Sequence, residues 1–146
     1  MDLLYRILIY IHVLSAIISI GPFFILLPIV NKLRSTKDAE MNGHLSIFWF
    51  VVRMTKHAGH GLVISGVLLI LLGPWTWGTP WIVMTFVIMF GSVFFLARAF
   101  SPKLRKFPEK NANKAELAAG LKRSLWMYIT LLLAMLWFMV VKPALW

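Results

Sequence analysis

Four histidines are the side chains in this sequence best suited to chemistry, and three of them lie in long apolar runs. His12 lies in the first run, and His57 and His60 lie in the second. Arg53, His57 and His60 are spaced i, i+4 and i+7, so they share one face of a helix. A polar side chain in hydrocarbon is costly, and its presence there indicates a function. His44 belongs to a polar segment, where we expect it to be solvated.

A stripe of polar side chains also follows the first apolar run. Tyr5, His12, Ser15 and Ser19 recur at helical spacing and therefore share one face. We expect this face to point toward other helices rather than toward lipid. The simplest role for His12 is then a hydrogen bond between helices.

Acidic residues and cysteines are missing from the apolar runs, and this narrows the chemistry that the histidines can perform. The sequence has no cysteine, which excludes thiolate metal sites, Fe–S clusters and cysteine nucleophiles. Ion-coupled carriers normally use acids within the membrane, and catalytic zinc sites need a carboxylate as base or ligand. A haem iron needs only one or two neutral axial ligands and an apolar pocket, so haem b is the favoured cofactor. All five acids lie outside the apolar runs: Asp2, Asp38, Glu40, Glu109 and Glu116.

The depth of each histidine suggests how such a haem would be ligated. At 1.5 Å per residue, His12 lies about 15 Å below the outer surface, His60 about 20 Å and His57 about 24 Å. His12 and His60 are therefore the predicted axial ligands of the iron, with His57 as the substitute for His60.

Residues near these histidines complete the predicted cofactor site. Gly59 and Gly61 flank His60 and leave room for a flat macrocycle. Ser15 lies one turn from His12, and Arg53 could form a charge-assisted pair with a haem propionate.

The elements that must position these residues are membrane-spanning helices. Sixty per cent of the 146 residues are hydrophobic and 14% are charged, whereas soluble domains are usually about 45–50% apolar and about 25% charged. The apolar residues form four spans, at about residues 3–30, 47–73, 81–100 and 124–142, in a single domain of residues 1–146. Two prolines and two glycines in residues 73–80 predict a tight turn between the second and third spans. The sequence predicts an all-α integral membrane protein, a four-helix up-and-down transmembrane bundle, and excludes a soluble enzyme.

Two connecting segments are harder to interpret. Residues 47–52 could form an interfacial helix or the first turns of a long tilted second span. The segment Ser101–Gly120 contains two prolines and ends in a short helical patch at 115–119, which we expect on the membrane surface.

The distribution of basic residues predicts the orientation of the bundle. Thirteen of the 15 Lys and Arg residues lie between spans one and two or between spans three and four, which leaves only Arg6 and Lys142 for the other side. By the positive-inside rule both basic loops are cytoplasmic, and both termini lie outside. The net charge of +10 is thereby explained by topology in a bacterial cytoplasmic membrane, with the lipid bilayer as partner and no nucleic acid.

Several short motifs are similar to those of a known family. The chain resembles the HemJ-type membrane proteins, and more broadly the CopD-like proteins, over most of its length. HemJ-type proteins are four-helix, haem b-binding protoporphyrinogen oxidases, so the resemblance implies haem b and His12 as its ligand. The motifs that carry it are Ile11–Ala16, Gly21–Phe24, Arg53 with Gly66, Leu96–Arg98 and Val140–Pro143.

Other features depart from that family. HemJ-type proteins carry a lysine in the third span, whereas residues 81–97 contain no ionisable side chain. The tyrosine- and histidine-containing stretch of the family is here Ser92–Phe95, and the His57/His60 pair is additional. The resemblance therefore implies the haem but not the oxidase substrate.

The sequence as a whole favours a small membrane b-type cytochrome that serves electron transfer, haem handling or redox sensing rather than catalysis. We expect a homodimer or a larger partner subunit. Three alternatives remain open: a cofactor-free subunit or assembly factor, a HemJ-like oxidase, and a copper-handling protein. Copper would use His57 and His60 with methionine thioethers from spans three and four.

Overall fold

The computed structural model describes residues 2–35, 37–109 and 113–146, and these ranges form five α-helices and no strand. Lys110, one of the basic residues predicted between spans three and four, lies outside them. The helices are α1 (Asp2–Leu33), α2 (Asp38–Leu72), α3 (Pro80–Ala99), α4 (Ser101–Lys106) and α5 (Lys114–Val141).

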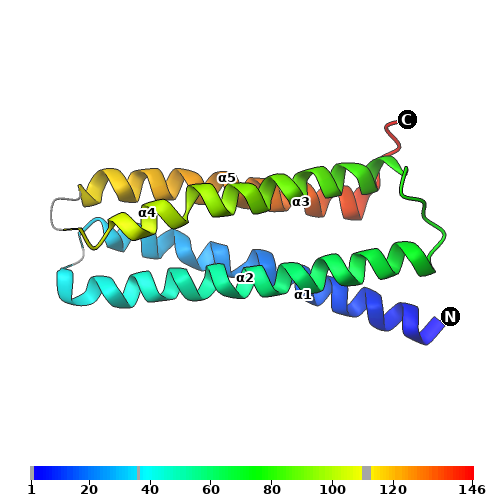
Figure 1. Ribbon diagram of the computed structural model, residues 1–146, viewed down its shortest axis with the longest axis horizontal. Helices are drawn as coiled ribbons and strands as arrows, with labels where there is room; N and C mark the ends of the chain where they lie inside the picture. The colour runs from blue at the N-terminus through cyan, green and yellow to red at the C-terminus, as the bar shows by residue number, and fades with distance from the viewer. Residues whose placement is uncertain (1, 36, 110–112) are drawn as a thin grey trace.

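Four apolar helices confirm the all-α prediction. In the described part of the chain, α1, α2, α5 and the α3–α4 segment are each long and apolar enough to cross a membrane. They run alternately up and down, and both ends of the chain lie at the same end of the bundle as the α2–α3 turn (Figure 1).

Two helices begin earlier than the sequence indicated. α2 starts at Asp38 rather than near residue 47, so residues 47–52 belong to one continuous helix. Met41 and Leu45 are buried on its inner face, and this packing extends the helix beyond the apolar run. α5 starts at Lys114 rather than near residue 124, because the Asn113 side chain accepts a hydrogen bond from the Glu116 N–H. The expected surface patch at 115–119 is therefore the beginning of α5.

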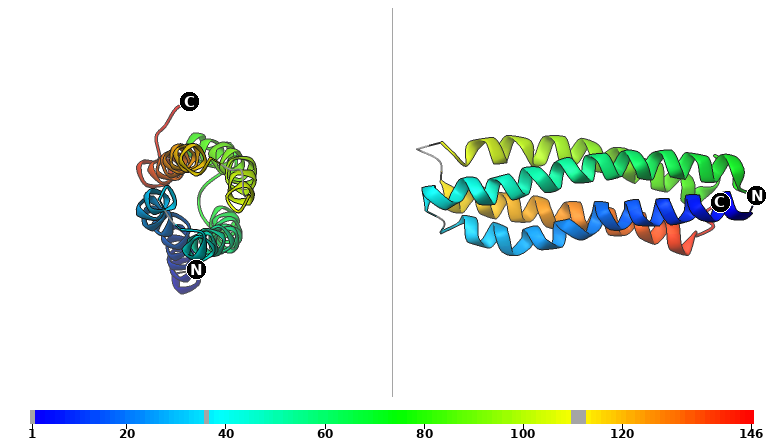
Figure 2. Two further views of the ribbon diagram at one scale, coloured as in Figure 1. Left: turned by 90° about the vertical axis from the view of Figure 1, so that its left-hand side faces the viewer. Right: turned by 90° about the horizontal axis from the view of Figure 1, so that it is seen from below.

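The helices pack as two pairs. α1 lies against α2, α3 lies against α5, and contacts between α1 and α5 join the pairs. Seen end-on, the helices surround a central space (Figure 2).

The most tightly packed part of the core lies in the half of the bundle toward the basic loops. An aromatic cluster joins three helices there, because the Phe23 ring lies 4.7 Å from the Tyr128 ring and 6.1 Å from the Phe100 ring, between centroids. Phe95 stacks on Tyr128 at 6.4 Å. The fully buried side chains of α1 are all in this half: Phe23, Leu26, Val30 and Leu33.

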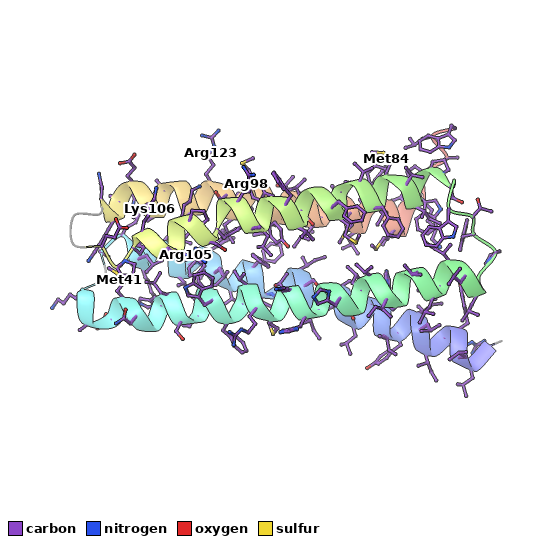
Figure 3. The ribbon with its side chains drawn as sticks, in the orientation of Figure 1. Met41, Met84, Arg98, Arg105, Lys106 and Arg123 are labelled. Atoms are coloured by element: carbon purple, nitrogen blue, oxygen red, sulfur yellow. The ribbon has the colours of Figure 1, made fainter. Side chains whose placement is uncertain are left out.

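The basic residues gather at this same end. Arg105, Lys106 and Arg123 lie toward the end of the bundle that carries the α1–α2 loop, and Met84 lies toward the opposite end (Figure 3). Lys103 connects α4 to α5, because its Nζ donates to the Gly120 carbonyl at 3.1 Å and to Ser124 Oγ at 2.6 Å.

The opposite end is closed by the predicted turn. The Thr79 N–H donates to the Thr76 carbonyl at 3.0 Å, and the Trp75 and Trp81 rings meet edge to face at 5.3 Å. The ammonium of Lys142, at the end of α5, lies 4.9 Å from the Trp75 ring centroid and 5.5 Å from that of Trp81. These cation–π contacts connect the end of α5 to the turn.

Close approach of α1 and α2 generates a prediction about stability. A Cβ at Gly61 would lie 3.0 Å from Ser15 Oγ, so the Gly61→Leu variant must push the two helices apart. We expect this overpacking to lower the free energy of unfolding by about 1–3 kcal/mol. The measurement is the Tm of the detergent-solubilised protein. Gly91→Leu is the control, since Gly91 is exposed and a Cβ there meets nothing within 4 Å. Equal Tm values for the two variants would contradict this packing.

Candidate functional site

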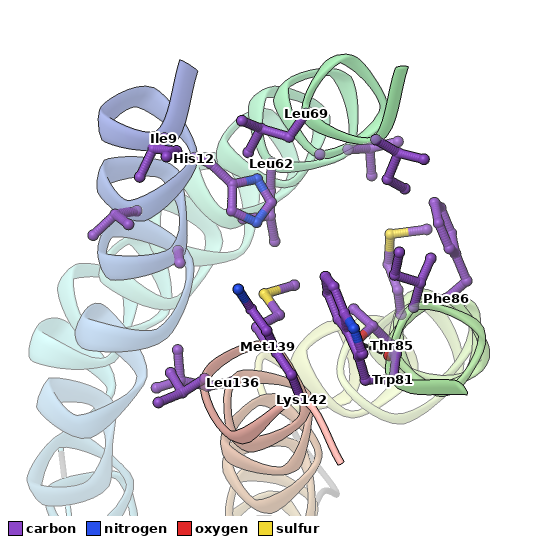
Figure 4. Close-up of a pocket in the computed structure, with 18 of the residues that line it drawn as sticks. Ile9, His12, Leu62, Leu69, Trp81, Thr85, Phe86, Leu136, Met139 and Lys142 are labelled. Atoms are coloured by element: carbon purple, nitrogen blue, oxygen red, sulfur yellow. Dashed lines mark hydrogen bonds between the residues drawn. The ribbon is translucent and has the colours of Figure 1, made fainter. Parts of the chain in front are cut away.

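A cavity of about 540 Å³ occupies the half of the bundle opposite the packed core. Side chains from α1, α2, α3, α5 and the α2–α3 turn line it, and most of them are apolar (Figure 4). Ligand pockets in proteins typically measure about 300–1,000 Å³ and carry a few placed polar groups. The residues of the lining that carry polar groups are Tyr5, His12, Trp75, Trp81, Thr85 and Lys142.

His12 extends from α1 into this cavity (Figure 4). A hydrogen bond across to α2 holds its ring. Its Nδ1 lies 3.0 Å from Ser65 Oγ. The Ser65 hydroxyl lies 2.6 Å from the Gly61 carbonyl and 3.1 Å from the Leu62 carbonyl. A carbonyl can only accept, so the single hydroxyl proton points to the backbone. Ser65 must therefore accept from His12, and the proton of the imidazole is on Nδ1.

The consequence for chemistry lies on the other ring nitrogen. With the proton on Nδ1, His12 Nε2 keeps an unprotonated lone pair. A neutral imidazole fixed by a hydrogen bond at its second nitrogen is the usual state of a histidine that ligates a metal. His12 is thus prepared to bind a metal ion or to accept a proton.

Gly66 provides the space that the ring needs. A Cβ at Gly66 would lie 3.1 Å from His12 Cε1 and 3.6 Å from Nδ1, so alanine there would require the imidazole to shift by a few tenths of an ångström. Gly73 has a similar relation to Tyr5, whose hydroxyl would lie 3.0 Å from a Cβ there. These glycines allow side chains of α1 to lie close to the backbone of α2.

Two donors that the sequence did not predict lie at the cavity wall nearest the turn. Lys142 brings a positive charge, and the Trp81 Nε1–H is buried with no hydrogen-bond partner among the described residues. A buried donor without an acceptor is rare in folded proteins. A negative group on a bound molecule at this wall would pair with the Lys142 ammonium. The sequence alone gave Trp81 no role at a cofactor site, and it used Lys142 only as one of the two basic residues on the other side of the bundle.

The cavity also has a pair of soft donors. The thioethers of Met89, from α3, and Met139, from α5, are both in its lining. Thioether sulfur suits haem iron and copper, although methionine in an apolar helix often serves only as filler.

The predicted residues of α1 face inward as expected. Tyr5 and His12 line the cavity, and Ser19 is buried with its hydroxyl donating to the Ser15 carbonyl at 2.8 Å. Ser15 itself lies at the α1–α2 contact, next to Gly61. Gly61 is therefore used for helix packing, and a Cβ at Gly59 would meet nothing within 4 Å.

The predicted residues of the α2 polar face lie elsewhere. Arg53, His57 and His60 are exposed and do not line the cavity. The rings of His57 and His60 lie 6.4 Å apart between centroids. The structure therefore does not bring His60 or Arg53 to the cavity with His12.

Metal-ligating side chains do not cluster within the described ranges, where no group of three or more His, Cys, Asp or Glu residues could hold an ion. Any metal at His12 would need further ligands, such as those that a porphyrin supplies. Comparison of the chain with models of protein families, with the sequences of characterised proteins and with solved structures finds no match.

The tautomer of His12 is directly testable. In ¹⁵N NMR spectra of the protein without cofactor, we expect His12 to carry its proton on Nδ1. The Ser65→Ala variant removes the acceptor, so this preference should be lost. Ser92→Ala is the matched control, because the Ser92 hydroxyl is buried and donates to the Met89 carbonyl of its own helix at 2.8 Å. A proton on Nε2 of the wild-type protein would contradict the arrangement.

Proposed function

We propose that this protein binds haem b in the cavity, with His12 Nε2 as an axial ligand, and acts as a small membrane b-type cytochrome. The observation that carries the proposal is the hydrogen bond from His12 Nδ1–H to Ser65, because it leaves Nε2 free at the cavity. When bound, the haem would supply one-electron chemistry for electron transfer, haem handling or redox sensing.

The residues present fit this cofactor. The cavity volume of about 540 Å³ lies in the range of cofactor sites, and its lining is mostly apolar. Haem requires few protein donors, which agrees with a lining in which the described side chains include one histidine and no carboxylate. The resemblance of residues 11–16 and 21–24 to HemJ-type proteins favours the same cofactor.

Lys142, rather than Arg53 as predicted from the sequence, is the basic residue placed to pair with a haem propionate. Lys142 lines the cavity, and its ammonium lies 5.5 Å from the centroid of the Trp81 ring. A propionate on this wall would form a charge-assisted hydrogen bond with Lys142. Arg53 is exposed on α2 and does not reach the cavity.

Met89 and Met139 lie in the lining, and either thioether could supply a further ligand to the iron. Ligation by histidine and methionine raises the reduction potential relative to two histidines. The potential of the bound haem would therefore show whether a thioether ligates the iron.

The membrane setting follows from the helices and the charges. We infer that the four apolar helices cross a bacterial cytoplasmic membrane, with the basic end of Figure 3 in the cytoplasm. Both termini and the Trp-rich turn then face outward, which places the cavity in the outer half of the bilayer. A second copy of the chain or a partner subunit would complete the assembly.

Replacement of His12 gives the decisive functional prediction. Wild-type protein purified in detergent should show a reduced-minus-oxidised b-type spectrum, with about one haem per chain by the pyridine haemochrome assay. His12→Ala should lose this haem because no other imidazole lines the cavity. His60→Ala is the matched control, since His60 is exposed on α2, and should keep both spectrum and stoichiometry.

Two results would overturn the assignment. Unchanged haem content in His12→Ala would remove His12 as ligand. A wild-type protein that stays colourless after haem is supplied during expression would favour the cofactor-free subunit.

In the same assay, Lys142→Gln should retain the spectrum but release haem about tenfold faster, since one charge-assisted hydrogen bond is lost.

The sidedness can be measured with single cysteines, because the natural chain has none. Thr76 lies exposed in the turn, and Glu109 lies exposed after α4 at the basic end. In spheroplasts, a membrane-impermeant thiol reagent should label the Thr76→Cys variant directly. It should label Glu109→Cys only after permeabilisation. The reverse labelling pattern would contradict the orientation.

A further inference from the structure

A polar patch interrupts the exposed apolar face of α2. The side chains of Arg53, His57 and His60 are exposed and share the face of Phe50 and Ile64, which are 65% and 62% exposed. The buried residues of α2, such as Leu62 and Ser65, lie on the other side of the helix, against α1 and the cavity. The patch therefore points away from the bundle.

Depth makes this patch costly for a single chain in a membrane. Counted from Leu72 at 1.5 Å per residue, His60 lies about 18 Å and His57 about 22 Å from the outer end of α2. The hydrocarbon core is about 30 Å thick, so both imidazoles lie within it. Arg53 lies about 28 Å from the outer end, and its long side chain can reach the cytoplasmic headgroups. An imidazole is too short to do so.

The histidines find no partner within the described part of the chain. Apart from the contact between their own rings, no hydrogen bond or ion pair engages His57 or His60 there. Glu40 and Glu116 cannot pair with these histidines, because they lie in the first turns of α2 and α5, at the basic end of the bundle. A polar group in hydrocarbon must be satisfied, so its partner lies outside the chain.

We propose that a second copy of this chain covers this face, through reciprocal hydrogen bonds between His57 of each copy and His60 of the other. A neutral imidazole has one donor and one acceptor, so imidazoles can satisfy one another without any other group. A two-fold interface pairs each residue with its counterpart reciprocally, which this pair of histidines fits. Ile64 and Leu71, both 62% exposed, supply apolar contact around the pair.

Charge favours a second copy over other occupants. The two histidines are neutral when they donate and accept in this way, so the interface buries no net charge at their depth. The two Arg53 side chains lie closer to the cytoplasmic end, where headgroups and water screen their repulsion. A metal ion shared by four neutral imidazoles would instead bury an uncompensated dication in a low dielectric.

The proposal rests on the membrane insertion proposed above and is independent of the haem. It is tested with single cysteines in native membranes. Ile64→Cys, next to the histidine pair on α2, should form a disulfide-linked dimer upon mild oxidation. Val93→Cys is the matched control, because Val93 is 61% exposed on α3 and lies outside the proposed interface. Cross-linking of both variants to the same extent, or of neither, would overturn the proposal.

The histidines are tested by replacing both. We expect His57→Leu/His60→Leu to associate about tenfold more weakly, measured by energy transfer between labelled copies in lipid vesicles. Wild-type helicity and Tm of the variant would show that it folds, and an unchanged b-type spectrum would separate this result from failure of the haem proposal. Dimerisation equal to wild type would overturn the proposal. A stoichiometric metal ion whose removal dissociates the dimer would also overturn the proposal.

Discussion

One hydrogen bond, from His12 Nδ1–H to Ser65 Oγ, determines what the rest of this molecule can do. It joins α1 to α2, orients the imidazole toward the cavity and fixes which nitrogen is available. Its direction follows from the short contact between the Ser65 hydroxyl and the Gly61 carbonyl, which takes the only hydroxyl proton. Gly66 is part of the same constraint, because a Cβ there would press on the His12 ring at 3.1 Å.

The bundle divides into two halves that serve this site differently. Toward the basic end, Phe23, Phe100 and Tyr128 fill the space between the helices and hold them together. Toward the turn, the same helices line a cavity, and the Lys142 ammonium lies over the Trp75 and Trp81 rings at its wall. The packed half provides the rigidity that a preformed site needs, and the hollow half provides the volume.

The four helices, the turn at residues 73–80 and the inward face of His12 could all be predicted from the sequence, since hydropathy and helical spacing determine them. The direction in which the face of Arg53, His57 and His60 points could not be predicted from the sequence. Spacing identifies residues that share a face, but only packing decides where that face points, and Ser65 and Gly66 place the opposite side of α2 against α1. Lys142 was missed because its proximity to Trp81 exists only in three dimensions.

The proposed function requires above all that the cavity next to His12 binds one haem and that no other histidine ligates it. Titration of haem into purified His57→Leu/His60→Leu protein, followed by its Soret absorption, tests this most directly. We expect saturation at one haem per chain with the affinity and spectrum of the wild-type protein. Loss of haem binding in this variant, while the wild-type protein binds haem, would contradict this site. It would mean that His57 or His60 on α2 ligates the iron.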